Sequence, residues 1–204
     1  MRLTSLFAFV LIAALIAPAF AQAPPAAPPT RIRGTVEKLD NHTLTVKARD
    51  GGSTAVTLAP DFTVRTVVAK TLADIKPGDK VGITSVKGSD RTRQAIEVHI
   101  LPANLPNLRL GESPWDLRPD SLMTNAIVAQ VRSEPTGRTI KVTFNGNESE
   151  ITVPQGAPIV GYGPGDASLL KPGTTVFVFA RKQPDGNLTA AFVTAEKDGV
   201  KPPM

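Results

Sequence analysis

The chain has 204 residues, of which 41% are hydrophobic, 20% charged and 5% aromatic, with 19 Pro, 16 Gly and a formal net charge of +5. This length and composition suit one or two small folded domains and are too apolar for a largely disordered chain. The sequence contains no Cys, which excludes a disulfide scaffold, a thiol nucleophile and any Cys-ligated zinc or iron–sulfur site.

The first 21 residues have the pattern of a secretory signal peptide. Arg2 supplies a positive start, residues 6–16 form an apolar core, and Ala19 and Ala21 give a small-x-small cleavage site. This core is shorter than the roughly twenty residues that a membrane-spanning helix needs. We therefore expect cleavage after Ala21, export of the chain, and a Pro/Ala-rich linker at residues 22–30.

From residue 31 onward, apolar and polar residues alternate with a period of two, which predicts β-strands. Turn sequences rich in Asn, Asp and Gly interrupt the pattern and predict hairpins at residues 40–41, 50–52, 145–147 and 184–187. Strands are expected near 32–40, 43–49, 53–59, 62–68, 79–87, 92–101, 125–133, 138–144, 148–154, 158–161, 174–182 and 188–197. Single helical turns are expected near residues 71–75 and 166–170. The predicted fold class is all-β.

The two halves of this β region repeat one another at an interval of 95 residues. Three anchors carry the repeat: Val56-Thr57-Leu58 with Ile151-Thr152-Val153, Ile75-Lys76-Pro77-Gly78 with Leu170-Lys171-Pro172-Gly173, and Ala95 and Val98 with Ala190 and Val193. A constant interval predicts a tandem duplication. We expect two small OB-like barrels of five to six strands, repeat 1 at residues 31–101 and repeat 2 at residues 125–199.

The segment between the repeats, residues 102–124, is rich in Pro, Asn and Leu and holds Trp115, the only Trp of the chain. Its apolar side chains are too numerous for a free linker. We expect an irregular strap that lies along one or both barrels, with Trp115 in a surface groove and available to a partner. Residues 200–204 form a short C-terminal tail.

The repeated Lys-Pro-Gly turn with its flanking hairpins resembles an exported bacterial family with OB-like barrel repeats, domain of unknown function number 5666. Pro114-Trp115-Asp116-Leu117, Met123-Thr124-Asn125-Ala126 and Pro202-Pro203-Met204 resemble relatives of that family labelled as metal-transporter permeases. We set the permease label aside, because a permease needs several apolar spans and the mature sequence contains none of that length. The resemblance implies a periplasmic location, and it supplies no catalytic residues.

His42 and His99 are the only histidines of the chain and the best candidate metal ligands. If the first hairpin and the last strand of repeat 1 are neighbours, Asp40 or Glu97 would complete a nitrogen and oxygen site for copper or zinc. The alternative is that both histidines are ordinary surface residues. Met123 and Met204 are weaker candidates, as thioether ligands of copper(I), and the alternative for Met123 is a packing residue at the start of a strand.

Other candidate sites have less support from the sequence. Glu148 and Glu150 lie two apart on one predicted strand, which suits an acid–base pair or, more simply, solubilising charges on an edge strand. The glycine-rich segment 161–166 lacks the Lys-Ser/Thr of a phosphate loop, so we interpret it as a turn with Asp166 as the N-cap of the next helical turn. Tyr162 within it is a candidate residue for gating a groove and contacting a partner.

The sequence therefore predicts an exported, non-enzymatic binding module whose partner is another cell-envelope protein, with no cofactor and no catalytic residues. The alternative is a periplasmic copper- or zinc-binding protein that uses His42 and His99, and a more distant one is a carbohydrate-binding module or hydrolase. Nucleic acid is not an expected partner, because repeat 1 has Phe62 as its only aromatic residue and the basic residues form no block.

Overall fold

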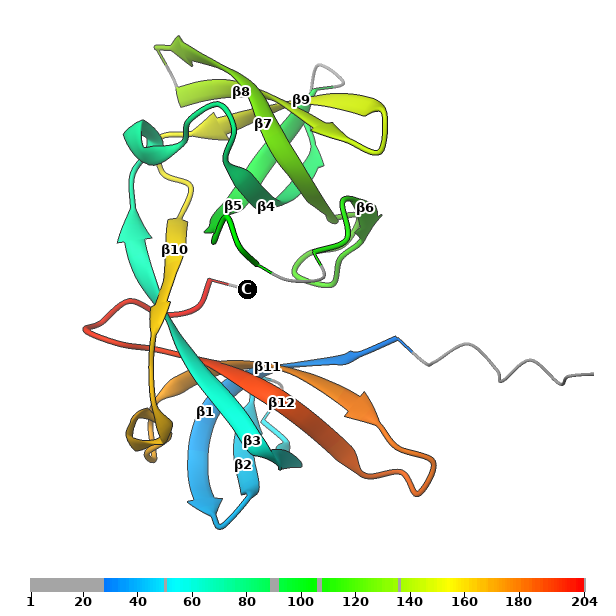
Figure 1. Ribbon diagram of the computed structural model, residues 1–204, viewed down its shortest axis with the longest axis vertical. Coiled ribbons are helices and arrows are strands. Elements are labelled where there is room, and N and C mark those ends of the chain that lie inside the picture. The colour runs from blue at the N-terminus through cyan, green and yellow to red at the C-terminus, as the bar shows by residue number, and fades with distance from the viewer. Residues whose placement is uncertain (1–27, 50, 89–91, 106–107, 136, 204) are drawn as a thin grey trace, which may run out of the picture.

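The computed structural model describes residues 28–203 apart from residues 50, 89–91, 106–107 and 136. The predicted signal peptide and residues 22–27 of the predicted linker lie outside the described residues. The described part of the chain is almost entirely β-structure, which confirms the predicted all-β class (Figure 1). In those same ranges, no helix has the length and apolar character needed to cross a membrane.

Hairpin turns lie where the sequence predicted them, because residues that tolerate a left-handed backbone stand at their tips. Asn41 and Asn145 have φ values of +51° and +48°, and Gly186 has +88°. Asn and Gly adopt such values at lower cost than other residues. Each of these turns reverses the direction of the chain between two paired strands.

Both predicted helical turns are present as short 3-10 helices, η1 (Leu72–Asp74) and η2 (Ala167–Leu169). Asp166 is the N-cap of η2, and its carboxylate accepts the backbone N–H two residues further on at 2.8 Å. A Lys-Pro-Gly turn follows each helix, and its glycines, Gly78 and Gly173, have φ values of +90° and +91°. These positive φ values are a reason for glycine at both turns.

A closed ring of five strands forms the first barrel. Its members are β1 (Thr30–Asp40), β2 (Thr43–Ala48), β3 (Ser53–Lys70), β11 (Thr175–Lys182) and β12 (Leu188–Ala195). β1 pairs with β2 and β11, and β3 closes the ring by running parallel to β12. The inward side chains, among them Leu44, Val56 and Val178, pack into one fully buried core.

The second barrel is a ring of the same kind. Its members are β4 (Lys80–Lys87), β5 (Arg93–Leu101), β7 (Leu122–Glu134), β8 (Gly137–Phe144) and β9 (Asn147–Pro154). β4 pairs with β5 and β7, and a short parallel pairing between β5 and β9 closes the ring. Val81, Ile140 and Ile151 lie in its separate core.

Each barrel combines strands from both sequence repeats. The β4–β5 hairpin of the first repeat completes the second barrel, and the β11–β12 hairpin of the second repeat completes the first barrel. The predicted domains, one barrel at 31–101 and one at 125–199, therefore differ from the structure. The exchange is possible because the two repeats are alike, so each hairpin fits the barrel of the other repeat as well as its own.

A two-stranded ribbon carries the chain between the barrels along one side of the molecule (Figure 1). The sequence predicted separate strands at 53–59 and 62–68, but these form the single 18-residue strand β3. The end of β3 leaves the first barrel and pairs antiparallel with β10 (Ile159–Pro164). β10 also runs parallel to β5 of the second barrel, so the ribbon joins both rings into one continuous sheet.

The strap between the repeats contacts both barrels. Its strand β6 (Gly111–Pro114) pairs with β7 of the second barrel. The next two residues, Trp115 and Asp116, contact the first barrel through Arg31, Arg33 and Phe179.

Candidate functional site

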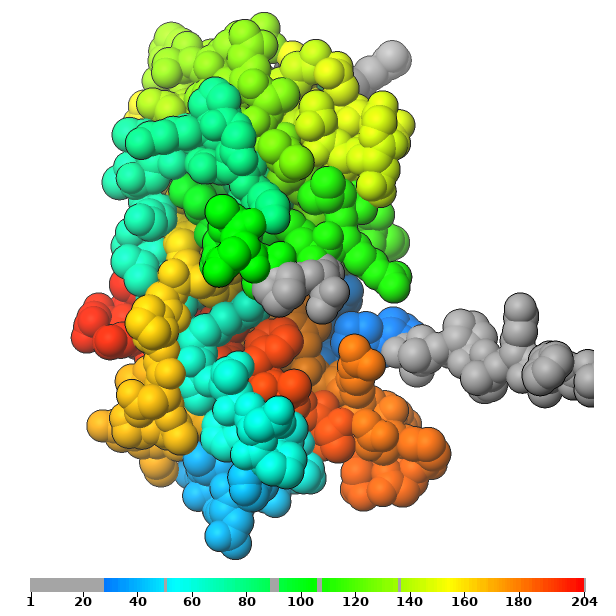
Figure 2. All heavy atoms as spheres, in the orientation of Figure 1, coloured from blue at the N-terminus to red at the C-terminus, as the bar shows by residue number. Residues whose placement is uncertain are grey.

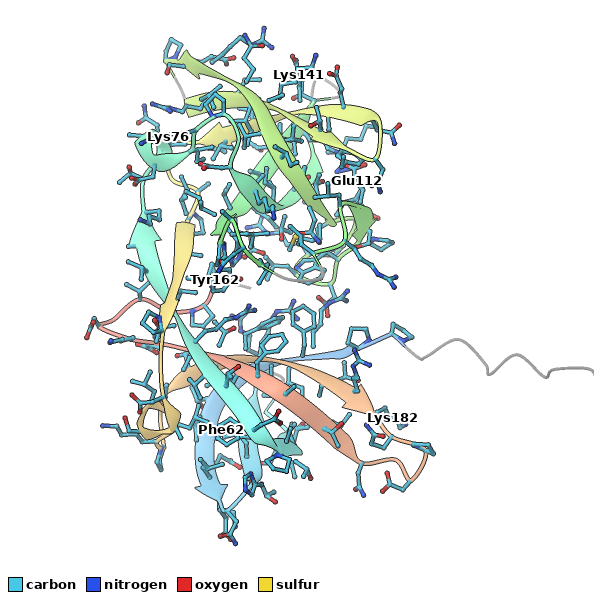
Figure 3. The ribbon with its side chains drawn as sticks, in the orientation of Figure 1. Phe62, Lys76, Glu112, Lys141, Tyr162 and Lys182 are labelled. Atoms are coloured by element: carbon cyan, nitrogen blue, oxygen red, sulfur yellow. The ribbon has the colours of Figure 1, made fainter. Side chains whose placement is uncertain are left out.

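The two barrels face each other across outer faces that are buried. On β5, Val98 points into the core, so its two neighbours Glu97 and His99 point away from it, and a register shift between Ala95 and Glu97 lets Ala95 face the core as well. Both are nevertheless buried, with exposed fractions of 0% and 2%. The first barrel has a similar outer face, where Phe177 lies between two core valines of β11 and is itself fully buried. The space between the barrels therefore holds side chains that the cores exclude (Figure 3).

Glu97 and His99 are only partly satisfied by their neighbours. The hydroxyl of Thr84 donates a hydrogen bond to Glu97 Oε1 at 2.5 Å. The other carboxylate oxygen of Glu97 and Nε2 of His99 are buried without a hydrogen-bond partner. Nε2 of His99 lies 3.8 Å from Glu97 Oε1, which is too long for a hydrogen bond.

Tyr162 on β10 contacts this pair from the ribbon (Figure 3). Its hydroxyl lies 3.1 Å from His99 Nδ1, and the two rings stack with centroids 5.8 Å apart. The guanidinium of Arg65 lies 4.3 Å above the ring of Tyr162, and Arg65 Nε donates to the hydroxyl of Thr194 at 2.9 Å. We call Glu97, His99, Tyr162 and Arg65 the interbarrel cluster, because it joins the second barrel, the ribbon and the first barrel.

Burial shifts the pKa of two members of this cluster, Tyr162 and Arg65. It raises the pKa of the Tyr162 hydroxyl above its ordinary value, and the nearby Glu97 carboxylate adds to the rise while Arg65 opposes it. Burial also lowers the pKa of the Arg65 guanidinium. Tyr162 is thus held as a neutral phenol and remains a hydrogen-bonding group at physiological pH.

The structure does not bring the two histidines together. His42 is exposed in the turn between β1 and β2 of the first barrel, where its ring lies edge-on to Phe62 at 6.1 Å. His99 lies on β5 of the second barrel and contacts Tyr162 instead. The predicted metal site made of His42 and His99 is therefore not formed, because the exchange of hairpins places the last strand of repeat 1 in a different barrel from the first hairpin.

Trp115 lies on the outer face of the first barrel. The Arg31 guanidinium is 4.0 Å from the centre of its ring, and Phe179 packs against it with centroids 6.1 Å apart. Asp116 accepts a hydrogen bond from Arg33 at 2.8 Å. Burial raises the pKa of the Asp116 carboxyl, but the hydrogen bond and the charges of Arg33 and Arg31 outweigh it, so the net pKa is below the ordinary value.

An open groove of about 1190 Å³ lies on the first barrel beside β11 and β12. Figure 2 shows this side of the molecule, with β12 in red between β3 in cyan and the end of the β11–β12 hairpin in orange. The groove is lined by two aromatic rings, three cations and small or neutral residues: Phe179, Phe192, Arg109, Arg181, Lys182, Pro28, Pro29, Ala59, Leu108, Gln183, Thr189, Ala190 and Ala191. None of these described lining residues is acidic.

The groove lies at a break in strand register. The β11–β12 register shifts between Val178 and Arg181, and the β12–β3 register shifts between Ala190 and Phe192. Such bulges redirect side chains and are common beside binding sites. The sequence does not predict the groove, although one signal is present: Phe179 and Phe192 stand 95 residues after Thr84 and Glu97, so these aromatic rings have no aromatic counterpart in the first repeat.

The acidic pair singled out in the sequence is used in ordinary ion pairs. Glu148 lies 2.6 Å from Lys141, and Glu150 contacts Arg132. Across the described ranges, no three His, Asp or Glu side chains gather in a way that would hold a metal ion.

No family model, curated protein or solved structure matches the chain. The resemblance to an exported bacterial family therefore stays a prediction, and the functional argument depends on the geometry of the protein itself.

Proposed function

We propose that the protein is an exported, non-enzymatic binding module that holds an acidic segment of another cell-envelope protein in the groove beside β11 and β12. The observation that carries the proposal is the lining of that groove, which combines two aromatic rings with three cations and no carboxylate among the described residues. Aromatic and arginine side chains are the groups that supply most of the energy in protein interfaces.

The charge of the groove selects the partner. Arg109 lies on the strap side, whereas Arg181 and Lys182 end β11, and all three are exposed. Cations on both sides of a groove attract a negatively charged chain and raise the rate at which it associates. Phe179 and Phe192, which are half-buried, offer apolar contacts between these charges. An extended acidic peptide with apolar side chains fits this arrangement.

Trp115 contributes to the groove indirectly, through its contact with Phe179. It packs against Phe179, whose ring lines the groove, and Arg31 packs against the other part of the indole. In this proposal Trp115 positions a wall of the groove, and Tyr162 acts in the interbarrel cluster and not on the partner.

Export is the second part of the proposal. It depends on the signal-peptide pattern of residues 1–21, with cleavage after Ala21, and on the resemblance to an exported family. A periplasmic location supplies envelope proteins as partners.

The test uses the mature chain, residues 22–204, and a fluorescent peptide of about ten residues that alternates Glu with Leu. Fluorescence anisotropy should show binding that weakens with added salt. The double variant Arg181→Glu/Lys182→Glu should weaken it at least about tenfold, since it reverses two of the three groove charges. The matched control is Lys76→Glu/Lys87→Glu, which makes the same charge change at two exposed lysines, one just before β4 of the second barrel and one at its end.

Three results would contradict the proposal. One is the absence of binding, and another is an equal loss of affinity in the control variant. The third is binding of a polyuronate but not of the peptide, which would assign the groove to an acidic polysaccharide.

A further inference from the structure

We propose that the outer face of the second barrel contains a buried binding site for one copper(I) ion, formed by His99, Glu97 and Met123. The site is separate from the groove, which lies on the first barrel.

The strand register places the donor groups around a glycine. His99, Gly82 and Asn125 stand opposite one another on β5, β4 and β7. Glu97, Thr84 and Met123 form the next row on the same three strands. Alternation along the strands puts both rows on the face that points away from the core.

Gly82 lacks a side chain at the centre of this arrangement, and its neighbours approach the position that a Cβ would occupy. A Cβ placed on Gly82 would lie 3.2 Å from Asn125 Oδ1, 3.6 Å from Met123 Sδ and 3.9 Å from His99 Cβ. The thioether sulfur and the amide oxygen are therefore aimed at the side-chain position of Gly82. Met123 is buried, with an exposed fraction of 7%.

Two polar atoms of the same rows lack a hydrogen-bond partner. Glu97 Oε2 and His99 Nε2 are both buried, and a buried polar group that stays unpaired is costly to the fold. Nδ1 of His99 is engaged by Tyr162 at 3.1 Å. A second hydrogen bond of this kind orients a metal-binding imidazole and leaves its Nε2 free to coordinate.

The donor set favours copper in its monovalent state. A thioether is a soft ligand that selects copper(I), and imidazole is a good ligand for copper. One carboxylate balances the charge of a monovalent ion, whereas a divalent ion would leave a net positive charge in a buried place. Arg65, which lies over the ring of Tyr162, adds to the cost of any further positive charge.

The first barrel shows that the fold itself does not require these donors. In the second repeat, Phe192 and Thr194 occupy the positions of Glu97 and His99. In the first barrel, the strand neighbour of Phe179 is Arg31. In the second barrel, the corresponding neighbour of Thr84 is Met123. The equivalent face therefore carries aromatic and cationic side chains in place of N, O and S ligands. We expect one copper ion per chain.

The test is an anaerobic titration of the mature chain with copper(I) against a chromophoric copper(I) chelator. One equivalent should bind, and Met123→Leu should weaken its binding at least about tenfold. Leu has nearly the volume of Met, so this variant keeps the packing. X-ray absorption should show a sulfur neighbour of copper that is lost in Met123→Leu. His99→Asn should likewise lose the ion.

The matched controls are Met204→Leu and His42→Asn, which should both keep one equivalent. The proposal is overturned if the chain takes no copper from the chelator, or if Met123→Leu binds as tightly as the parent chain. Loss of copper in His42→Asn, or a preference for zinc(II) over copper(I), would also overturn it. Should His99→Asn fail to fold, Met123→Leu still decides between these results.

Discussion

Val67 and Tyr162 are direct partners in the β3–β10 ribbon, and they are also equivalent residues of the two sequence repeats. Tyr162 stands 95 residues after Val67, the same interval that separates Ile75 from Leu170. Two equivalent residues that pair antiparallel lie on a local two-fold axis. The ribbon is therefore the point about which the repeats exchange their hairpins.

This exchange predicts that the two barrels unfold together. Leu44→Ala in the first barrel and Ile140→Ala in the second each remove a fully buried side chain. Each should lower the free energy of unfolding by about 2–5 kcal/mol. Because each barrel contains a hairpin from the other repeat, either variant should shift one common transition, followed by Trp115 fluorescence and by hydrogen exchange in β8.

Two separate transitions, each sensitive to only one of these variants, would contradict the shared construction. So would a fragment of residues 31–101 that folds alone, because that fragment lacks β11 and β12.

Gly34 is predicted to be irreplaceable for a steric reason. A Cβ there would lie 2.0 Å from the carbonyl oxygen of Lys47 on the neighbouring strand. Gly34→Ala should therefore destabilise the protein by more than about 2 kcal/mol in chemical denaturation. Gly156→Ala is the matched control, since a Cβ at Gly156 meets nothing within 4 Å and should change stability by less than about 0.5 kcal/mol.

The only tyrosine of the chain reports on the interbarrel cluster. Burial raises the pKa of Tyr162, so tyrosinate absorbance of the folded protein should appear above the ordinary value of about 10. The unfolded chain loses this proton first, so the contribution of Tyr162 to stability is present below pH 10 and falls as the pH rises toward the folded-state pKa. Tyr162→Phe should remove that alkaline loss. A folded-state midpoint at or below that of the denatured chain would contradict the burial.

Acid should loosen the strap. The pKa of Asp116 lies below its ordinary value because Arg33 and Arg31 outweigh the effect of burial. A depressed carboxyl pKa gives stability that is present above about pH 4 and is lost as the pH falls through the folded-state pKa. The Asp116 side chain is about half exposed, so the loss should stay below about 1 kcal/mol. Trp115 fluorescence should change in this pH range, and Asp116→Asn should abolish the change. An unaltered acid transition in that variant would contradict the assignment of the transition to Asp116.

Much of the fold was predictable because it depends on local rules. The period of two, the Asn and Gly turns and the interval of 95 residues predicted the strands, hairpins and duplication that the structure shows. The exchange of hairpins was not predictable, since Ala95 and Ala190 occupy the same place in the repeat and either hairpin suits either barrel. Which barrel receives a hairpin is decided by the long ribbon of β3 and β10, which is a tertiary feature.

The site was predicted only in part. His99, Glu97, Met123 and Tyr162 were each named as candidates, but no sequence spacing indicated that His99 and Tyr162 are neighbours. The structure joins them because β10 runs parallel to β5, a pairing of strands about sixty residues apart. The groove is not predictable from the sequence because its residues come from both repeats, the strap and the linker, and only the folded chain brings them together.

The most direct test of the proposed function is two-dimensional NMR of the isotope-labelled mature chain during titration with the acidic Glu/Leu peptide. The shifted amide signals should cluster at the groove, around Phe179, Arg181, Lys182 and Phe192. The Arg181→Glu/Lys182→Glu variant should not show them. Shifts centred on the second barrel would contradict the assignment of the groove as the binding site. An absence of shifts at a large excess of peptide would also contradict it.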